Sequence, residues 1–399
     1  MAPTQTLQHK NVRWKAFPVF MAFLAMGFVD AVGPFVSLAQ REFQLSATIA
    51  SLIPLIGLGM FGLLSIPAGI LQQHRGKQFS LLLGLAILLA GMLNACFALA
   101  SFAQFLATIV LIGIGAAVLQ VSGNPLMRDV SAEGMYARNL SLAQFVKAIG
   151  SISGPLIPAI AARYWGASWK IIFPVYSGVL VLIILIACIW RTDSTIHNTE
   201  AATLRSCFQL LKNRYVLAMT SAIGCYVGAE VCISTGIPLL LKERFDVDIA
   251  RIGLLGTGLF FAVLTLGRLC GSVLLNWITP TRFLQDTCVV SIIGLCALFL
   301  AAKKIVIASF VLTGLGFANI FPLIFSSAVA RMPERSNEIS ALMVTAIVGG
   351  AVLPQLMGIV ADHSSVRTSM LIPLFSLMYV AKVALRRERG AEGRPNASS

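Results

Sequence analysis

Long apolar runs, each interrupted by a few charged or turn-forming residues, repeat along the chain from one end to the other. Most are close to the ~20 residues that an α-helix needs to cross the hydrocarbon core of a bilayer. The pattern therefore predicts twelve membrane-spanning helices joined mainly by short loops. The expected spans cover residues 16–39, 48–71, 79–100, 103–126, 138–163, 168–190, 215–240, 249–277, 283–301, 304–330, 337–361 and 367–385.

The amino-acid composition excludes a water-soluble globular protein. Of the 399 residues, 57% are hydrophobic and only 12% are charged, whereas about 25% are charged in an ordinary soluble domain. Twelve spans with short loops use roughly 300 to 350 residues. Little of the chain remains for a soluble domain.

The net charge of +14 is explained by membrane orientation. Of the 30 Lys and Arg residues, 19 fall in segments expected on the cytoplasmic side and nine on the outer side. Such a bias follows the positive-inside rule and predicts that both termini are cytoplasmic. These cations face the anionic lipid of the inner leaflet, so we expect no nucleic-acid partner.

Two pairs of similar strings, each offset by about 200 residues, indicate a tandem duplication. LAQREFQLS at 38–46 resembles LLKERFDVD at 240–248, and LIGIG at 111–115 resembles LTGLG at 312–316. An offset of six spans preserves orientation, so the repeats are parallel and enclose a central cavity that opens to alternate sides. The predicted parts are an N-terminal six-helix bundle (1–190), a cytoplasmic linker (191–214), a C-terminal six-helix bundle (215–385) and a cytoplasmic tail (386–399).

Three charged residues stand out near the middle of predicted spans, where a charge costs several kcal/mol unless it finds a partner or water. They are Asp30 in GFVDAVG, Lys147 in LSLAQFVKAIG and Glu230 in YVGAEVCISTG. Asp30 and Glu230 occupy nearly equivalent places in the two halves. We predict that these three residues couple transport to protons. The alternative is a fixed pair of Lys147 with Asp30 or with Glu230 that only joins helices.

Amide and aromatic side chains in the spans are the candidates for binding an uncharged solute. Amides offer donors and acceptors without net charge, which suits the hydroxyl groups of a sugar. An aromatic face suits a pyranose ring. The predicted binding residues are Gln120, Asn124, Gln144 and Asn319, with Phe28, Tyr226 and Phe321 as an apolar wall. The alternatives are interhelical hydrogen bonding for the amides and plain packing for the aromatic rings.

Gly and Pro clusters mark helices that bend or approach one another closely. They are GNPL at 123–126, SGPLIP at 153–158, GIP at 236–238, FPL at 321–323 and VGGAVLP at 348–354. We expect local unwinding of the helices at these places.

The sequence contains no GxxxxGK[ST] loop, no HExxH and no nucleophile elbow. The eight cysteines have no metal-type spacing, and the four histidines lie in predicted tails and loops. We therefore expect neither an enzyme nor a bound cofactor or metal. Transport is expected to use gradients rather than nucleotide hydrolysis.

Six strings together resemble one family over both halves of the chain. They are QVSGNPLMRDVS (120–131), NLSLAQF (139–145), YVGAEVCIS (226–234), GRLCGSVLLNWITP (267–280), IFPLIF (320–325) and SALMVTAIVGGAVLPQLMGIVAD (340–362). The chain resembles the fucose–galactose–glucose:proton symporter family of the major facilitator superfamily. The resemblance implies an all-α integral membrane fold of twelve transmembrane helices in two parallel-repeat bundles. It also implies uptake of a monosaccharide with protons, or with sodium in some relatives.

Carried over residue by residue, the resemblance is mixed. Glu230 matches the GAE motif, and Gln144 matches the first amide position of the LAQ segment. Lys147 stands where fucose-type members have a second amide. Gln120 replaces their acidic residue, as in glucose/galactose-type members. The place of the family's essential aspartate falls one helical turn after Asp30, and we expect Asp30 to take that role.

These departures leave two uses for the cation in the fifth span. Lys147 could pair with Asp30, or it could select an anionic solute such as a sugar acid. Electrostatics favours the pair, because an unpaired buried charge is costly in the empty carrier.

The sequence thus predicts an importer of a hexose or deoxyhexose, such as glucose, galactose or fucose, by proton symport with alternating access. We expect a monomer in a bacterial inner membrane, with solute, protons and lipid as its partners. One alternative is an antiporter or carrier for another small polar or anionic solute. The other is a non-transporting sensor or scaffold, for which the linker and tail offer no signalling domain.

Overall fold

A computed structural model describes residues 3–30, 39, 42–45, 49, 52–97, 101–189, 203–245, 249–299 and 303–391. Every regular element among these residues is a helix. The all-α fold expected from the apolar pattern is therefore confirmed.

The helices form two units. The first unit comprises residues 1–210 and 329–345, and the second comprises 211–328 and 346–399. Elements of the first are α1 (Pro3–Asp30), α4 (Leu52–Arg75), α5 (Lys77–Phe97), α6 (Phe102–Asp129), α7 (Tyr136–Trp165), η1 (Trp169–Ile171), α8 (Ile172–Ile189), α9 (Leu204–Leu210), η2 (Pro333–Arg335) and α15 (Ser336–Thr345). Elements of the second are α10 (Arg214–Phe245), α11 (Ile249–Leu274), α12 (Pro280–Ala297), α13 (Lys303–Phe317), η3 (Ala346–Val348), α16 (Gly349–His363), α17 (Val366–Ser369) and α18 (Leu371–Ala391). Helix α14 (Ile320–Arg331) begins in the second unit and ends in the first.

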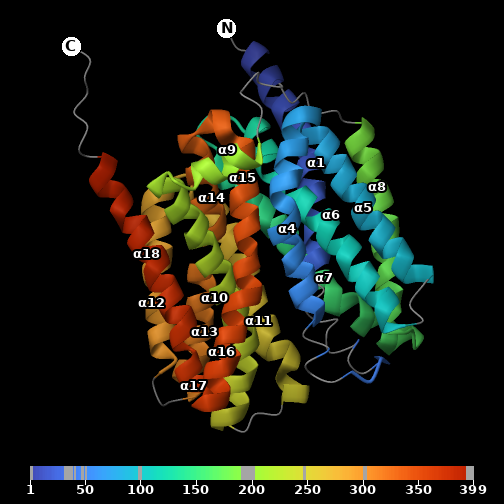
Figure 1. Ribbon diagram of the computed structural model, residues 1–399, viewed down its shortest axis with the longest axis vertical. Helices are drawn as coiled ribbons and strands as arrows, with labels where there is room; N and C mark the ends of the chain where they lie inside the picture. Colours follow the sequence, from blue (N-terminus) through green and yellow to red (C-terminus); the bar gives the residue numbers. More distant parts are fainter. Residues whose placement is uncertain are drawn as a thin grey trace. The chain divides into compact units, whose positions relative to one another are not determined.

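Long apolar helices dominate both units, and in the first α4, α5, α6 and α8 run side by side (Figure 1). Within the described residues, nine helical segments are long and apolar enough to cross a bilayer, and two shorter apolar helices cover Ala16–Asp30 and Phe260–Leu274. The described part of α1 ends at Asp30. Its expected continuation to residue 39 falls largely outside the described residues, so the count of twelve spans stays a prediction.

Local sequence signals explain where individual helices begin and end. The Ser101 side chain accepts a hydrogen bond from the Gln104 backbone amide, and the Gln104 side chain accepts one from the Ser101 amide. This capping box starts α6. At the C-terminus of the next helix, Gly166 ends α7. Its backbone has the left-handed conformation with φ +60°, which glycine adopts without steric cost.

Two of the expected spans are interrupted. The span expected over 304–330 consists of α13 and α14 with a break at Ala318 and Asn319. The span expected over 337–361 consists of α15, the 3₁₀ turn η3 and α16. At the first break, Pro322 has no backbone N–H to complete the helical ladder. The two breaks lie at or beside the clusters FPL and VGGAVLP, where the sequence predicts unwinding. The same expectation is wrong for GNPL, SGPLIP and GIP, because α6, α7 and α10 continue through them without a break.

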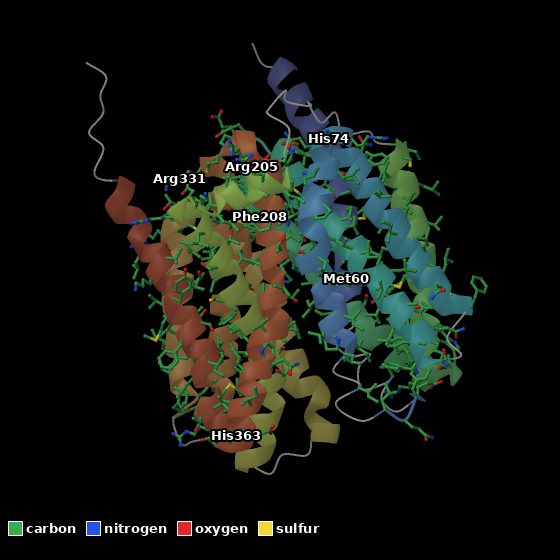
Figure 2. All side chains as sticks on the ribbon, viewed as in Figure 1. Met60, His74, Arg205, Phe208, Arg331 and His363 are labelled. Atoms are coloured by element: carbon green, nitrogen blue, oxygen red, sulfur yellow. The ribbon has the colours of Figure 1, made fainter. Side chains whose placement is uncertain are left out.

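The segment 329–345 belongs to the first unit through contacts of α15 with α4, α6 and α9. Gln72 Nε2 of α4 donates to Asn337 Oδ1 over 2.7 Å. Ser206 Oγ of α9 donates to Glu338 Oε1 over 2.9 Å. Helix α9, which carries Arg205 and Phe208 in Figure 2, lies within the linker expected over 191–214. Polar contacts thus join the linker helix and α15 to this unit.

A proline also determines how α15 is held. Pro125 inside α6 has no N–H for the Val121 carbonyl, its usual helical acceptor four residues earlier. Ser340 Oγ donates to this Val121 oxygen over 2.9 Å. The hydroxyl on α15 therefore replaces the missing amide donor.

We expect Ser340→Ala to lower the free energy of unfolding by about 1–3 kcal/mol, because it leaves a buried carbonyl without a donor. A thermal melt of the purified protein measures the change. Ser309→Ala is the matched control, because the Ser309 hydroxyl binds carbonyls within its own helix α13. Equal melting temperatures for the two variants would contradict this role of Ser340.

Candidate functional site

Helices α1 and α7 touch through glycine. A Cβ on Gly27 would lie 2.0 Å from the Lys147 carbonyl oxygen and 2.8 Å from Gly150 Cα. A Cβ on Gly150 would lie 2.4 Å from the Leu24 carbonyl oxygen. Only residues without a side chain permit this approach. Asp30, one turn after Gly27 on α1, is consequently brought beside the side chains of Lys147 and Ser151 on α7.

Asp30 and Lys147 form an ion pair, here named the α1–α7 charge pair. Lys147 Nζ lies 3.1 Å from Asp30 Oδ2. Ser151 Oγ donates to the same Asp30 oxygen over 3.1 Å. The Lys147 side chain is 12% exposed and the Asp30 side chain 40% exposed. The Asp30 carboxylate thus lies beside a cation and a hydroxyl donor, while part of it stays accessible to solvent.

A second pair, the α10–α11 charge pair, lies within the second unit. Arg268 Nη2 of α11 lies 3.6 Å from Glu230 Oε1 of α10, and the two side chains are 9% and 17% exposed. Arg268 Nε also donates to the Ala318 carbonyl oxygen over 3.4 Å. Each of these two pairs thus sets a cation that is mostly shielded from solvent beside a carboxylate of the same unit.

Sequence reasoning did not place Arg268 or Ser151 in the site. Arg268 lies in an apolar helix, where the cost of a buried cation already requires a partner. Sequence spacing did not reveal that partner, because Glu230 lies on a different helix. Ser151 lies one turn after Lys147 on α7, but short hydroxyl side chains in helices commonly bind their own backbone, so its position gave no clear signal.

The predicted amides of the first unit lie on α6 and α7 and are buried. Asn124 has no exposed surface, and its Nδ2 donates to the Gln120 carbonyl oxygen over 2.9 Å. Its Oδ1 is buried without a hydrogen-bond partner. Gln120 and Gln144 are each 4% exposed. The unsatisfied Asn124 oxygen is an acceptor that a solute hydroxyl or a water molecule can use.

Asn319 occupies the break between α13 and α14 in the second unit. Its Nδ2 donates to the Gly267 carbonyl oxygen over 2.8 Å, and its Oδ1 is buried without a hydrogen-bond partner. A Cβ on Gly271 would lie 2.2 Å from Asn319 Nδ2. Glycine at 271 therefore makes room for this amide against α11.

The three predicted aromatic residues separate into two groups. Phe28 stacks on Tyr176 of α8 in the first unit, with ring centroids 3.9 Å apart. Tyr226 and Phe321 lie together in the second unit, with centroids 6.4 Å apart. Tyr226 also donates its hydroxyl to the Phe317 carbonyl oxygen over 3.1 Å. The roles of these rings and of the amides in solute binding stay predictions.

The described residues hold no group of three or more His, Cys, Asp or Glu side chains that could ligate a metal ion. His74 and His363 lie at the ends of α4 and α16 (Figure 2). The chemistry available in the two pairs is proton exchange and hydrogen bonding.

Apolar helices of spanning length that carry buried ion pairs are typical of a multi-pass membrane transporter. The chain belongs to the Major Facilitator Superfamily, whose family model matches residues 19–353. The expectation of a transporter rather than an enzyme is thereby confirmed.

Relatives confirm the resemblance noted in the sequence. A Helicobacter pylori protein provisionally named a glucose/galactose transporter is 27% identical over 390 residues, covering 91% of this chain and 94% of the relative. The glucose/galactose transporter of Brucella abortus is 24% identical over 393 residues, covering 95% of both chains. The crystal structure of the Escherichia coli fucose:proton symporter FucP has a TM-score of 0.80 at 18% identity, covering 93% of this chain and 97% of that one. This last likeness shows that the fold is that of the superfamily.

Proposed function

We propose that the protein imports a monosaccharide, a hexose or deoxyhexose, together with protons by alternating access. The names of the relatives support the solute class and the coupling ion. Superfamily membership supports the alternating-access mechanism.

The α1–α7 charge pair carries the proposal for proton coupling. Asp30 is the more exposed partner; it forms an ion pair with Lys147 and accepts a hydrogen bond from Ser151. A proton that reaches Asp30 removes its negative charge and weakens its attraction to Lys147. The carrier with a proton on Asp30 and the carrier without one then differ in the interaction between α1 and α7. A coupling ion needs such a difference, because it shifts a conformational equilibrium only when it interacts differently with the two states.

We propose that four amides bind solute hydroxyl groups: Gln120, Asn124, Gln144 and Asn319. Three aromatic residues form apolar contacts with the sugar ring: Phe28, Tyr226 and Phe321. Glu230 takes part in proton coupling. Support comes from the free acceptors on Asn124 and Asn319. We further propose a monomer in a bacterial inner membrane with both termini cytoplasmic, built from two six-helix repeats. The Lys and Arg bias supports this orientation.

An anionic solute such as a sugar acid is the competing candidate. A site for an anion needs a cation that is not already neutralised. Lys147 lies beside Asp30 and Arg268 lies beside Glu230, so each cation has a carboxylate within its own unit. This pairing favours an uncharged solute.

Uptake into proteoliposomes tests the proposal. With an inward proton gradient, we expect labelled D-glucose, D-galactose or L-fucose to accumulate above its external concentration, and a protonophore to abolish the accumulation. Liposomes without protein are the control. Accumulation that follows a sodium gradient instead, expulsion of the sugar, or uptake of a sugar acid alone would refute it.

A further inference from the structure

The break between α13 and α14 leaves carbonyl groups that the helix itself does not satisfy. Pro322 lies four residues after Ala318, so the Ala318 oxygen lacks the amide donor that an uninterrupted helix would supply. Arg268 Nε supplies a hydrogen bond to it over 3.4 Å. The break is therefore held in part by a side chain from α11.

The same guanidinium group faces a second acceptor. Its Nη2 lies 3.6 Å from Glu230 Oε1. A guanidinium is planar and presents several N–H donors in fixed directions, so it can serve two acceptors at once. A lysine ammonium at this position has no such fork. Arg268 thus links the carboxylate on α10 to the backbone at the break.

Two neighbouring contacts show that the break is held from both α10 and α11. Tyr226, one turn before Glu230 on α10, donates its hydroxyl to the Phe317 carbonyl oxygen. Asn319 donates from the break to the Gly267 carbonyl oxygen, next to Arg268 on α11. The free Oδ1 of Asn319 is consequently positioned by the same contacts that hold the break.

We propose that Arg268 is a positioning residue that transmits the charge of Glu230 to the break between α13 and α14, and thereby to the amide of Asn319. With Glu230 ionised, the guanidinium is held between the carboxylate and the Ala318 oxygen. Once Glu230 is neutral, this restraint weakens and the break loosens. The role of this link in a transport cycle rests on the proposed proton-coupled uptake.

The titratable groups that face Glu230 are Arg268 and Tyr226. At the neighbouring turn of α10, α16 presents apolar atoms, because Leu353 lies against Gly228. The Ala346 carbonyl of η3 lies against Gly224. Among the described residues, the other titratable groups on the elements packed against α10 are Arg251 and Cys270 on α11, Lys303 and Lys304 at the start of α13, Asp362 and His363 at the end of α16, Arg367 on α17, and Tyr379, Lys382, Arg386, Arg387, Glu388 and Arg389 on α18.

Hydrogen exchange of the detergent-solubilised full chain tests this network without any solute. The readout is the protection of the backbone amides in residues 318–324, measured by mass spectrometry. We expect Arg268→Lys to lower this protection about tenfold, the effect of losing one hydrogen bond from a charged donor. Glu230→Gln should lower it in the same direction, because the amide holds the guanidinium less strongly.

Pro322→Ala separates this role from a general loss of structure. Alanine restores the N–H that binds the Ala318 oxygen, so the helix no longer depends on Arg268 at this point. We expect the Arg268→Lys/Pro322→Ala and Glu230→Gln/Pro322→Ala variants to regain wild-type protection. Arg282→Lys on the exposed face of α12 and Pro354→Ala in α16 are the matched controls and should leave residues 318–324 unchanged.

Wild-type protection in Arg268→Lys or in Glu230→Gln overturns the inference, as does failure of Pro322→Ala to restore protection in both backgrounds. If Arg268→Lys does not fold, the Glu230→Gln pair of variants decides. Uptake of labelled D-glucose, D-galactose and L-fucose under an inward proton gradient tests the transport step separately. Wild-type protein that shows no proton-driven uptake removes the proposed function, whereas the exchange results still decide whether Arg268 transmits the charge of Glu230.

Discussion

Replacing Gly27 by valine is expected to abolish the folded carrier. The new Cβ would lie 2.0 Å from the Lys147 carbonyl oxygen, and backbone atoms cannot rotate away as a flexible side chain can. Helices α1 and α7 would have to separate, which costs more than about 3 kcal/mol for overpacking of this kind. Separation would also pull Asp30 on α1 away from Lys147 and Ser151 on α7, because Asp30 lies one turn after Gly27 and the other two residues lie at the contact itself.

The amount of monodisperse protein in detergent and its melting temperature measure this effect. Gly178→Val in α8 is the matched control, since nothing lies within 4 Å of a Cβ at that position. The control should behave like the wild-type protein, because it adds the same branched side chain in open space. Equal recovery and melting temperature for Gly27→Val would show that α1 and α7 do not approach as closely as the geometry requires.

The spans follow from the sequence because hydrocarbon imposes a length and a composition on any helix that crosses it. The expected span 168–190 corresponds to the apolar segment Trp169–Ile189. The expected span 103–126 corresponds to α6, whose capping serine at 101 is itself a sequence signal. Such features are local, so they can be read without knowing which helices are neighbours.

The site was only partly predictable, because its contacts join distant parts of the chain. Asp30, Lys147 and Glu230 stand out as charges in apolar runs, and the sequence offered two partners for Lys147. Geometry selects Asp30, because Gly27 and Gly150 bring α1 and α7 into contact. Nothing in the spacing indicated that Glu230 has Arg268 as its own partner.

The break at Asn319 shows the same limit. The proline in FPL predicts unwinding, but it does not say which donors replace the missing amide. Arg268 donates to the Ala318 oxygen that Pro322 leaves without an amide, and Tyr226 donates to the neighbouring Phe317 oxygen. Backbone interruptions can therefore be predicted from sequence, whereas the side chains that stabilise them emerge only from tertiary packing.

Exchanging Asp30 for asparagine is expected to uncouple transport from protons. Asparagine has nearly the same shape and can still accept the Ser151 hydrogen bond, but it takes up no proton at physiological pH. Under an inward proton gradient, sugar accumulation should fall to the level of equilibration, while counterflow exchange of labelled sugar continues. Asp286→Asn on the exposed face of α12 is the matched control and should accumulate sugar like the wild type.

The Asp30→Asn/Lys147→Gln double variant distinguishes a proton site from a pair that only joins two helices. Removing Asp30 alone leaves the mostly buried Lys147 ammonium without its carboxylate. For a fully buried pair this lowers the free energy of unfolding by roughly 3–5 kcal/mol. The loss is smaller here because Asp30 is partly exposed. Removing both charges relieves that cost and should restore the melting temperature. If Asp30 is the proton site, the restored protein still exchanges sugar but does not accumulate it. Recovery of proton-driven accumulation in the double variant would reduce the pair to a structural contact and remove Asp30 from the coupling mechanism.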